Sequence, residues 1–307
     1  MLQLGFVSAI LPEYDLEQVL TTAARIGYDC VEVMCWPAPE RGVEERRYAG
    51  VRHLKLDSLV VAEVQELQRS TGVGISSLGY YPNVLDPTGA ERAIAHLRRL
   101  MEAAADLGIG RVTTFVGRDK GRTIEAQWDD MLRVWRPLLD LAGQLGVRVG
   151  IENCPMRFTA DEWPGGNNLA LSPAVWERLW QDLPDAHWGL NYDPSHLVLQ
   201  HMDPYRPLRD YPERLVHVHA KDLRIDREAL DRHGVFAHPK LWHTPKLPGL
   251  GDVDWQRFFG YLVESGYRSA VCVEVEDRAY ESKLDDRLTA LTMSHDYLRQ
   301  FIPRQRV

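Results

Sequence analysis

Short apolar runs alternate along the chain with longer segments in which apolar residues recur every three or four positions. The short runs have the length and the Val, Ile and Leu content of buried strands, and the longer segments have the period of an amphipathic helix. We therefore predict repeated strand–helix units. The eight predicted strands are residues 2–9, 30–35, 74–81, 111–117, 148–154, 188–194, 215–221 and 270–276.

Two predicted helices show the helical period clearly. Near 90–107 the apolar positions include Ile94, Leu97 and Met101, and the segment near 124–145 repeats the pattern with Trp128, Met131 and Trp135. Several helices end in a glycine, which takes the left-handed conformation of a C-terminal cap at no steric cost. These glycines are Gly27, Gly108, Gly146 and Gly266.

Strict alternation of strands and helices predicts an α/β protein with a parallel sheet. Eight units in 307 residues favour one domain, a single (β/α)₈ TIM barrel over residues 1–307. An open doubly wound sheet that binds nucleotides would place a glycine-rich turn after the first strand, and residues 8–13 read Ser-Ala-Ile-Leu-Pro-Glu instead. Two long connections, at about 155–173 and 222–253, are predicted to be active-site loops, because a barrel carries its chemistry at the carboxyl ends of its strands.

Polar residues collect at the carboxyl ends of the last four predicted strands. Side chains alternate between the two faces of a strand. His217, His219 and Lys221 therefore lie on one face of the predicted strand 215–221, and Glu274 and Glu276 lie on one face of the predicted strand 270–276. The alternate positions are valines, which suit the outer, helix-covered face, so the polar sets point into the barrel. Charged groups there must be paired or bound to a metal. The strand-end candidates are Glu152, Asp193, His219 and Glu274.

Carboxylates with one imidazole suit one divalent ion such as Mn²⁺, Mg²⁺, Co²⁺ or Zn²⁺. Each residue also has a simpler interpretation: a strand Glu can face solvent, and Asp193 can cap the turn at Pro194. Only their joint placement on consecutive strands favours a metal site. His217 is predicted to be a packing or supporting residue, and whether it or Glu276 assists the site stays open. His233, His238 and His243 are predicted to be solvated loop residues, with substrate contact as the alternative.

Composition narrows the class of protein. A net charge of −8 disfavours binding to nucleic acid, which requires a basic surface. The four cysteines form no CxxC pair, which favours a reducing compartment. The first residues lack the pattern of a signal peptide, and no apolar run reaches membrane-spanning length. We therefore expect a cytoplasmic protein with a small-molecule partner, and homo-oligomer formation stays open.

At these residues the chain resembles the xylose isomerase-like TIM barrel family of sugar isomerases and epimerases, which also contains tagatose and psicose epimerases and inosose dehydratase. The most specific segments are Glu152-Asn153, the run from Asp193 to His196, His217-Val218-His219 and residues 251–255. The resemblance implies that Glu152, Asp193, His219 and Glu274 hold the metal and that His196 contacts substrate. Further candidates for substrate binding are Lys221, Arg224, Trp36 and Tyr81, the two aromatic residues as platforms for a sugar ring.

The activity that the resemblance implies is metal-dependent isomerisation or epimerisation of a sugar or cyclitol. Glu152 and Glu274 would move a proton next to a carbonyl through an enediolate, with the metal as Lewis acid. A dehydratase or lyase on the same site and a non-catalytic sugar-binding barrel are the alternatives. DNA repair endonucleases of this superfamily need more metal-binding histidines, including one at the end of the third strand, where this chain has Tyr80-Tyr81. The stretch after Cys154 also departs from ketose epimerases, so the substrate and the native metal stay open.

Overall fold

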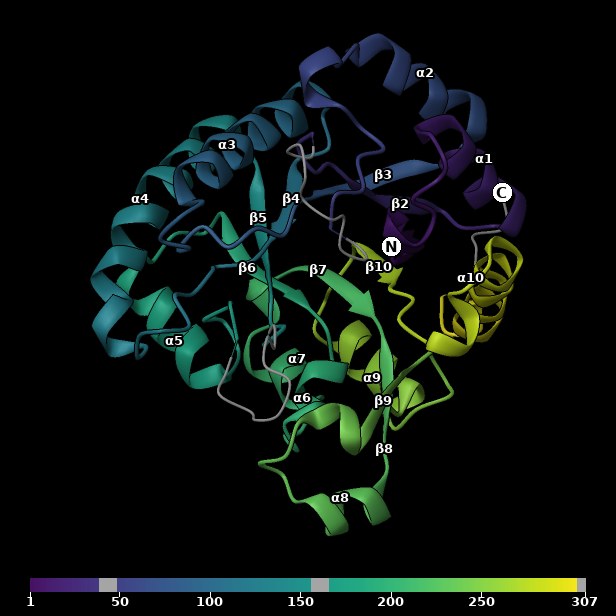
Figure 1. Ribbon diagram of the computed structural model, residues 1–307. Coiled ribbons are helices and arrows are strands. Elements are labelled where there is room, and N and C mark those ends of the chain that lie inside the picture. Colours follow the sequence, from purple (N-terminus) through teal and green to yellow (C-terminus); the bar gives the residue numbers. More distant parts are fainter. Residues whose placement is uncertain (39–48, 156–165, 303–307) are drawn as a thin grey trace.

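The computed structural model describes residues 1–38, 49–155 and 166–302, and within them eight parallel strands close into a barrel (Figure 1). Going around the barrel, the strand order is β1-β10-β7-β6-β5-β4-β3-β2. The strands are β1 (Gln3–Val7), β2 (Cys30–Met34), β3 (Gly74–Gly79), β4 (Arg111–Thr114), β5 (Arg148–Glu152), β6 (Trp188–Tyr192), β7 (Leu215–Ala220) and β10 (Ala270–Val273). Each falls inside a predicted run, and the predicted (β/α)₈ TIM barrel is confirmed.

Helices surround the barrel and cover its outer face (Figure 1). They are α1 (Leu16–Ile26), α2 (Val61–Thr71), α3 (Ala90–Asp106), α4 (Trp128–Leu145), α5 (Pro173–Asp182), α7 (Arg206–Asp210), α9 (Trp255–Glu264) and α10 (Leu284–Arg299). The short helix α6 (Ser195–Leu199) follows β6 at the carboxyl end of the barrel instead. The predicted capping glycines all adopt positive φ: Gly27 109°, Gly108 70°, Gly146 65° and Gly266 80°. No helix in these described ranges is both long and apolar enough to span a membrane.

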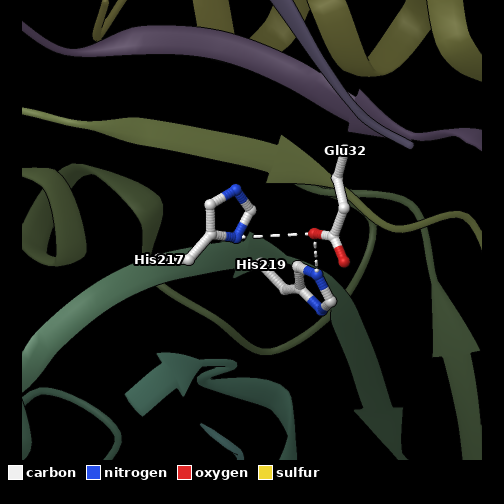
Figure 2. Close-up of side chains that lie close together, drawn as sticks. All are labelled: Glu32, His217 and His219. Atoms are coloured by element: carbon white, nitrogen blue, oxygen red, sulfur yellow. Dashed lines mark hydrogen bonds and ion pairs between the residues drawn. The ribbon is translucent and has the colours of Figure 1, made fainter. Parts of the chain in front are cut away.

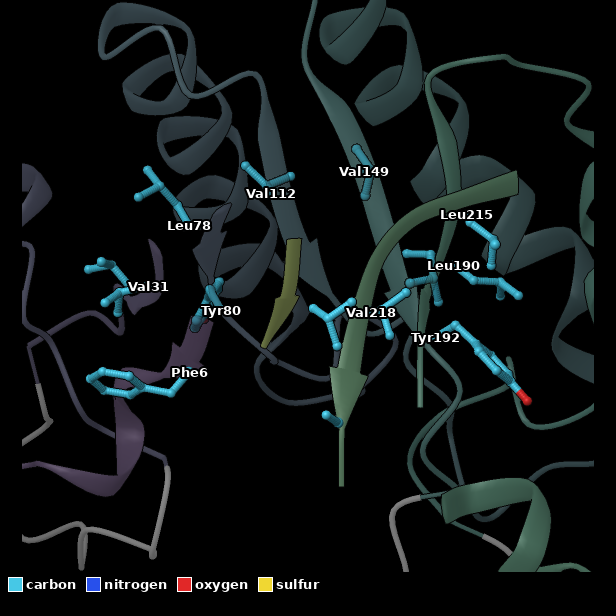
Figure 3. Packing of buried hydrophobic residues seen from close by; sticks show 14 of the residues in the cluster. Phe6, Val31, Leu78, Tyr80, Val112, Val149, Leu190, Tyr192, Leu215 and Val218 are labelled. Atoms are coloured by element: carbon cyan, nitrogen blue, oxygen red, sulfur yellow. The ribbon is translucent and has the colours of Figure 1, made fainter. Parts of the chain in front are cut away.

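The main hydrophobic core lies between the barrel and the helices, where the outward-facing strand residues pack (Figure 3). Val31, Leu78, Val112, Val149 and Val218 belong to this layer and are fully buried. A smaller apolar cluster that includes Val7, Cys30, Met34 and Cys272 fills the barrel on the β1, β2 and β10 side. The inward positions of the other strands carry the polar side chains, as the alternation predicts.

The connection at 222–253 contains regular structure that the sequence did not reveal. Strands β8 (Asp222–Ile225) and β9 (His243–Lys246) pair antiparallel, and α8 (Arg227–His233) lies between them at the bottom of the view in Figure 1. We call the segment from β8 to β9 the ribbon. Of the other predicted loop, at 155–173, residues 156–165 lie outside the described residues.

Asp222 fastens the ribbon to the barrel. Its carboxylate accepts hydrogen bonds from the backbone of Leu223, Gly249 and Val253 and from the indole of Trp255. Asp252 accepts a further bond from the backbone of Ile225 at 2.8 Å. Burial raises the pKa of Asp222, while these donors act to lower it. Residues 251–255, among the most specific segments of the sequence, therefore anchor the ribbon.

Candidate metal centre

Four predicted ligands meet at the carboxyl end of the barrel. Glu152 ends β5, Asp193 follows β6, His219 lies in β7 and Glu274 follows β10. One nitrogen or oxygen from each lies within 4.8 Å of the corresponding atoms of the others. Glu152, Asp193 and His219 are buried, and the Glu274 side chain is 16% exposed. Side chains separated by up to 122 positions in the chain thus form one compact group.

The backbone around this group is fixed by two asparagines. Asn153 and the backbone of Asp193 exchange two hydrogen bonds of 2.9 Å, which join the ends of β5 and β6. Asn168 donates to the carbonyl oxygen of Glu152 at 2.8 Å. Asp193 Oδ1 accepts from the backbone of Ser195 at 2.8 Å, so this carboxylate has one oxygen committed to the turn. Its second oxygen is left to face the other three side chains.

Asp193 Oδ2 and His219 Nδ1 both face the centre of the group: Asp193 Oδ2 lies 2.9 Å from Lys221 Nζ, and His219 Nδ1 lies 3.5 Å from Glu274 Oε2. Carboxylates this close together and this little exposed repel one another, and they are costly unless positive charge compensates them. Three carboxylates and one imidazole nitrogen are donors that a divalent cation of borderline or hard character accepts. The residues present therefore fit a metal ion.

Glu32 orients His219 (Figure 2). The His219 Nε2–H group donates to Glu32 Oε2 at 2.7 Å, and Nδ1, the other ring nitrogen, faces Glu274 at 3.5 Å. A carboxylate behind a histidine fixes its tautomer in the way that metal-binding histidines require. His217 Nδ1 lies 3.4 Å from the same Glu32 oxygen and 3.0 Å from Asn191 Oδ1. His217 thus supports the site from behind, in line with its predicted supporting role.

Glu32 is a site residue that the sequence analysis missed. It is fully buried in β2 and also accepts hydrogen bonds from the hydroxyls of Tyr81 and Thr113. Burial alone would raise the pKa of Glu32, but His219, His217 and the Tyr81 hydroxyl lower it to about 2. A glutamate on the inward face of an apolar strand, between Cys30 and Met34, was the signal in the sequence.

Lys221 brings a positive charge to the carboxylates. Its Nζ lies 2.7 Å from Glu274 Oε2, 2.9 Å from Asp193 Oδ2 and 3.7 Å from Glu276 Oε2. His196 Nε2 lies 3.1 Å from Glu152 Oε1 and 3.1 Å from Lys221 Nζ. Both predicted substrate-binding residues are therefore buried beside the four-residue group.

The two candidate catalytic glutamates have different electrostatic environments. Burial and the nearby charge of Glu274 raise the pKa of Glu152. Burial also acts to raise the pKa of Glu274, but Lys221 and His219 outweigh it and hold that pKa below its usual value. Glu274 is therefore held more strongly in its ionised form than Glu152.

A cavity of about 480 Å³ opens above the group. Trp36 and Tyr81, the two predicted aromatic platforms, line it, and the Tyr81 hydroxyl donates a hydrogen bond to Glu32. Other lining residues are Val7, Met34, Phe115, Leu199 and Leu223. Arg224 is not brought to the cavity: it lies on the exposed face of β8, because its neighbours Leu223 and Ile225 take the buried face.

The prediction that the ribbon histidines are solvated is wrong for two of the three. His238 and His243 are 8% and 6% exposed and line the cavity together with Lys240, whereas His233 is exposed. The ribbon folds back over the cavity and buries them, which a reading of residues 222–253 as an irregular loop could not anticipate.

Comparison with known proteins agrees with this architecture. The chain is 25% identical to the uncharacterized protein YfiH of Bacillus subtilis (strain 168) over an alignment of 316 positions, gaps included, which covers 90% of this chain and 93% of YfiH. It is 36% identical over 169 residues to an inosose dehydratase of Clostridium tetani (strain Massachusetts / E88), covering 54% of this chain and 53% of that enzyme.

A crystal structure of D-psicose 3-epimerase from Clostridium cellulolyticum H10 shares the fold, with a TM-score of 0.70 and 16% identity over 98% of this chain and 99% of that one. The model of the xylose isomerase-like TIM barrel family matches residues 20–301. This match spans nearly the whole chain, including all four residues of the buried group and the supporting Glu32. The chain therefore belongs to the xylose isomerase-like TIM barrel family.

Proposed function

We propose that the protein is a divalent-metal-dependent enzyme that moves a proton next to the carbonyl of a sugar or cyclitol, and so isomerises or epimerises it. The observation that carries the proposal is the group of Glu152, Asp193, His219 and Glu274, whose ligand atoms lie within 4.8 Å of one another at the carboxyl end of the barrel. Membership of the xylose isomerase-like family supports it.

In this proposal the four residues hold one ion, which supplies Lewis-acid stabilisation of negative charge on the substrate oxygen. Glu152 and Glu274 reach the substrate from different strands, so one removes the proton and the other returns it. Lys221 and His196 hold substrate hydroxyls. The Trp36 and Phe115 side chains in the cavity wall exclude water and face the carbon skeleton of the substrate.

Dehydration is a second candidate reaction with the same first step. After proton removal, a hydroxyl on the β-carbon would leave as water. The similarity to inosose dehydratase over about half of the chain favours an inosose, a cyclic polyhydroxy ketone, as a substrate to test for this reaction.

A solvent-exchange assay tests the shared first step. The purified protein is incubated in D₂O with an inosose and a panel of keto-sugars, with Mn²⁺ or Mg²⁺ and with EDTA, and the chelated mixtures are analysed by NMR. We expect metal-dependent deuterium incorporation next to the carbonyl of at least one substrate. A protein that exchanges no proton in any substrate would not be the proposed enzyme.

The Asp193→Asn and His219→Ala variants test the metal assignment. We expect both to lose tight metal binding while the barrel stays folded, because Asn keeps an acceptor for the Ser195 backbone and neither residue lies in the outer core. Elemental analysis after dialysis and circular dichroism provide the two measurements. Full metal occupancy in both variants would refute the assignment.

A further inference from the structure

Glu276 is a cavity carboxylate that lies outside the four-residue group. It lines the cavity, and it follows Glu274 by two positions, on the same face of the extended segment after β10. The four-residue group, whose ligand atoms lie within 4.8 Å of one another, does not include it. Glu276 is therefore placed to touch a substrate without binding the ion.

The turn that carries Glu276 is anchored on both sides. Val275 and Asp277 are each only 1% exposed. The Asp277 carboxylate lies 3.2 and 3.3 Å from the Lys246 ammonium of β9, and it accepts the backbone N–H of Ala279 at 3.1 Å. Glu276 therefore projects from a segment fixed between the barrel and the ribbon.

Lys221 connects Glu276 with the group. Its Nζ contacts Glu274 at 2.7 Å and Glu276 at 3.7 Å, so the two acids face one region of the cavity and can reach neighbouring atoms of one substrate. Neutralising Lys221 does not require Glu276, because Glu274 and Asp193 already lie within 2.9 Å of the ammonium. The position of Glu276 is thus available for another task.

Exposure distinguishes Glu276 from the other acids. Its side chain is 31% exposed, compared with 16% for Glu274 and 5% for Glu152. A group that gives up a proton in each turnover must regain one, and contact with solvent provides it. Among the acids in the described cavity lining, Glu276 has the best access to solvent protons.

We propose that Glu276 is the acid that protonates a departing β-hydroxyl, so that this site also dehydrates polyhydroxy ketones. This rests on the proposed function, whose first step it shares. One of Glu152 and Glu274 takes the α-proton, and the C–H electron pair becomes the new C=C bond. The β-carbon–oxygen bond breaks with its electron pair on oxygen, Glu276 gives its proton to that oxygen, and water leaves. The products are water and an α,β-unsaturated ketone. The glutamate that took the α-proton then releases it to solvent, and Glu276 takes a proton from solvent.

The Glu276→Gln variant separates this role from a supporting one. Gln keeps the size and polarity of the side chain but has no acidic proton to donate. We measure enone formation from an inosose by absorbance and α-deuterium incorporation by NMR, on metal-loaded wild type and variant. Glu264→Gln, an exposed position on α9, is the matched control and should behave as wild type.

We expect elimination to fall on the order of 10²-fold or more in Glu276→Gln, the size of a lost general acid, while α-exchange stays within about threefold of wild type. Glu276→Asp, which retains a proton donor, should recover part of the elimination.

An equal fall of both rates would mean that Glu276 only positions Lys221, and unchanged elimination would exclude any role, so either result overturns the proposal. Wild type that exchanges but never eliminates would refute the dehydration alone, whereas wild type without exchange would refute the proposed function itself.

Discussion

The hydrogen bond between His219 and Glu32 determines which nitrogen of His219 is available at the site. Because Nε2–H donates to Glu32, Nδ1 is the nitrogen that would bind an ion, and it faces Glu274. The carboxylate also makes the imidazole more basic, which strengthens its interaction with a cation. Glu32 touches neither the cavity nor the other three ligands in the four-residue group, and so acts through His219.

Glu32→Gln is expected to weaken metal binding by about 10–100-fold, the usual cost of losing a partner behind a metal ligand. Gln can still accept hydrogen bonds from Tyr81 and Thr113, so the barrel should remain folded. Isothermal titration with Mn²⁺ or Zn²⁺ measures the affinity, and Glu63→Gln on the exposed surface of α2 is the control. Wild-type affinity in Glu32→Gln would mean that the Glu32 bond is irrelevant to the metal.

The sequence predicted the four-residue group but not the supporting Glu32, for a physical reason. Glu152, Asp193, His219 and Glu274 stand at strand ends, where barrel geometry alone brings side chains together. Glu32 lies inside β2, and its role depends on a contact with His219, 187 positions away, which the periodicity of a single strand does not encode. Likewise, His238 and His243 are buried only because β8 and β9 pair.

At the scale of elements, the ribbon adds a second wall to a cavity that the barrel alone would leave open. Its two strands pair Ile225 with His243 and form what we call the near part of the ribbon. Residues 227–241, the far part, supply His238 and Lys240 to the cavity lining. The Asp222 carboxylate anchors the near part, because it accepts hydrogen bonds from Gly249 and from Trp255 at the start of α9. The paired strands therefore both attach the ribbon and line the cavity, through Leu223 and His243, whereas the far part contributes only to the lining.

Replacing residues 227–241 by Asn-Gly would remove the far part and retain the near one. Asp226 and Trp242 already share a backbone hydrogen bond of 2.8 Å, and Asn-Gly favours the tight turn that would join them. We expect KM to rise on the order of tenfold, about 1.4 kcal/mol, or substrate preference to change, with metal affinity retained. Steady-state kinetics on the substrate panel provide the measurement.

The control for the ribbon variant is Phe236→Ser, because Phe236 is 85% exposed and does not belong to the cavity lining. An unchanged KM and substrate profile in the shortened protein would show that the far part of the ribbon contributes nothing to recognition. A loss of metal binding would instead mean that the deletion disturbed the barrel end.

At the scale of the whole molecule, the contacts that join the two ends of the chain lie away from the cavity. Arg299 of α10 lies 2.7 Å from Asp29 Oδ2 and donates to the carbonyl oxygen of Gly27 at 2.6 Å. Asp29 Oδ2 in turn accepts the backbone N–H of Leu4 at the start of the barrel. In TIM barrels this end of the strands serves stability and the opposite end serves chemistry.

This separation predicts opposite effects for two substitutions. Arg299→Ala removes a largely buried partner of Asp29, so we expect it to cost about 2 kcal/mol and lower Tm on the order of 5 °C. Asp193→Asn should leave the Tm of the metal-free protein nearly unchanged, because Asn retains the hydrogen bond to the turn and Glu274 still pairs with Lys221. Metal at about 100 times its Kd should stabilise wild type and Arg299→Ala equally, by about 2.7 kcal/mol, and should not stabilise Asp193→Asn. Calorimetry of the three proteins with and without metal measures these differences. A smaller metal-induced increment in Arg299→Ala would mean that the two ends of the barrel are energetically coupled.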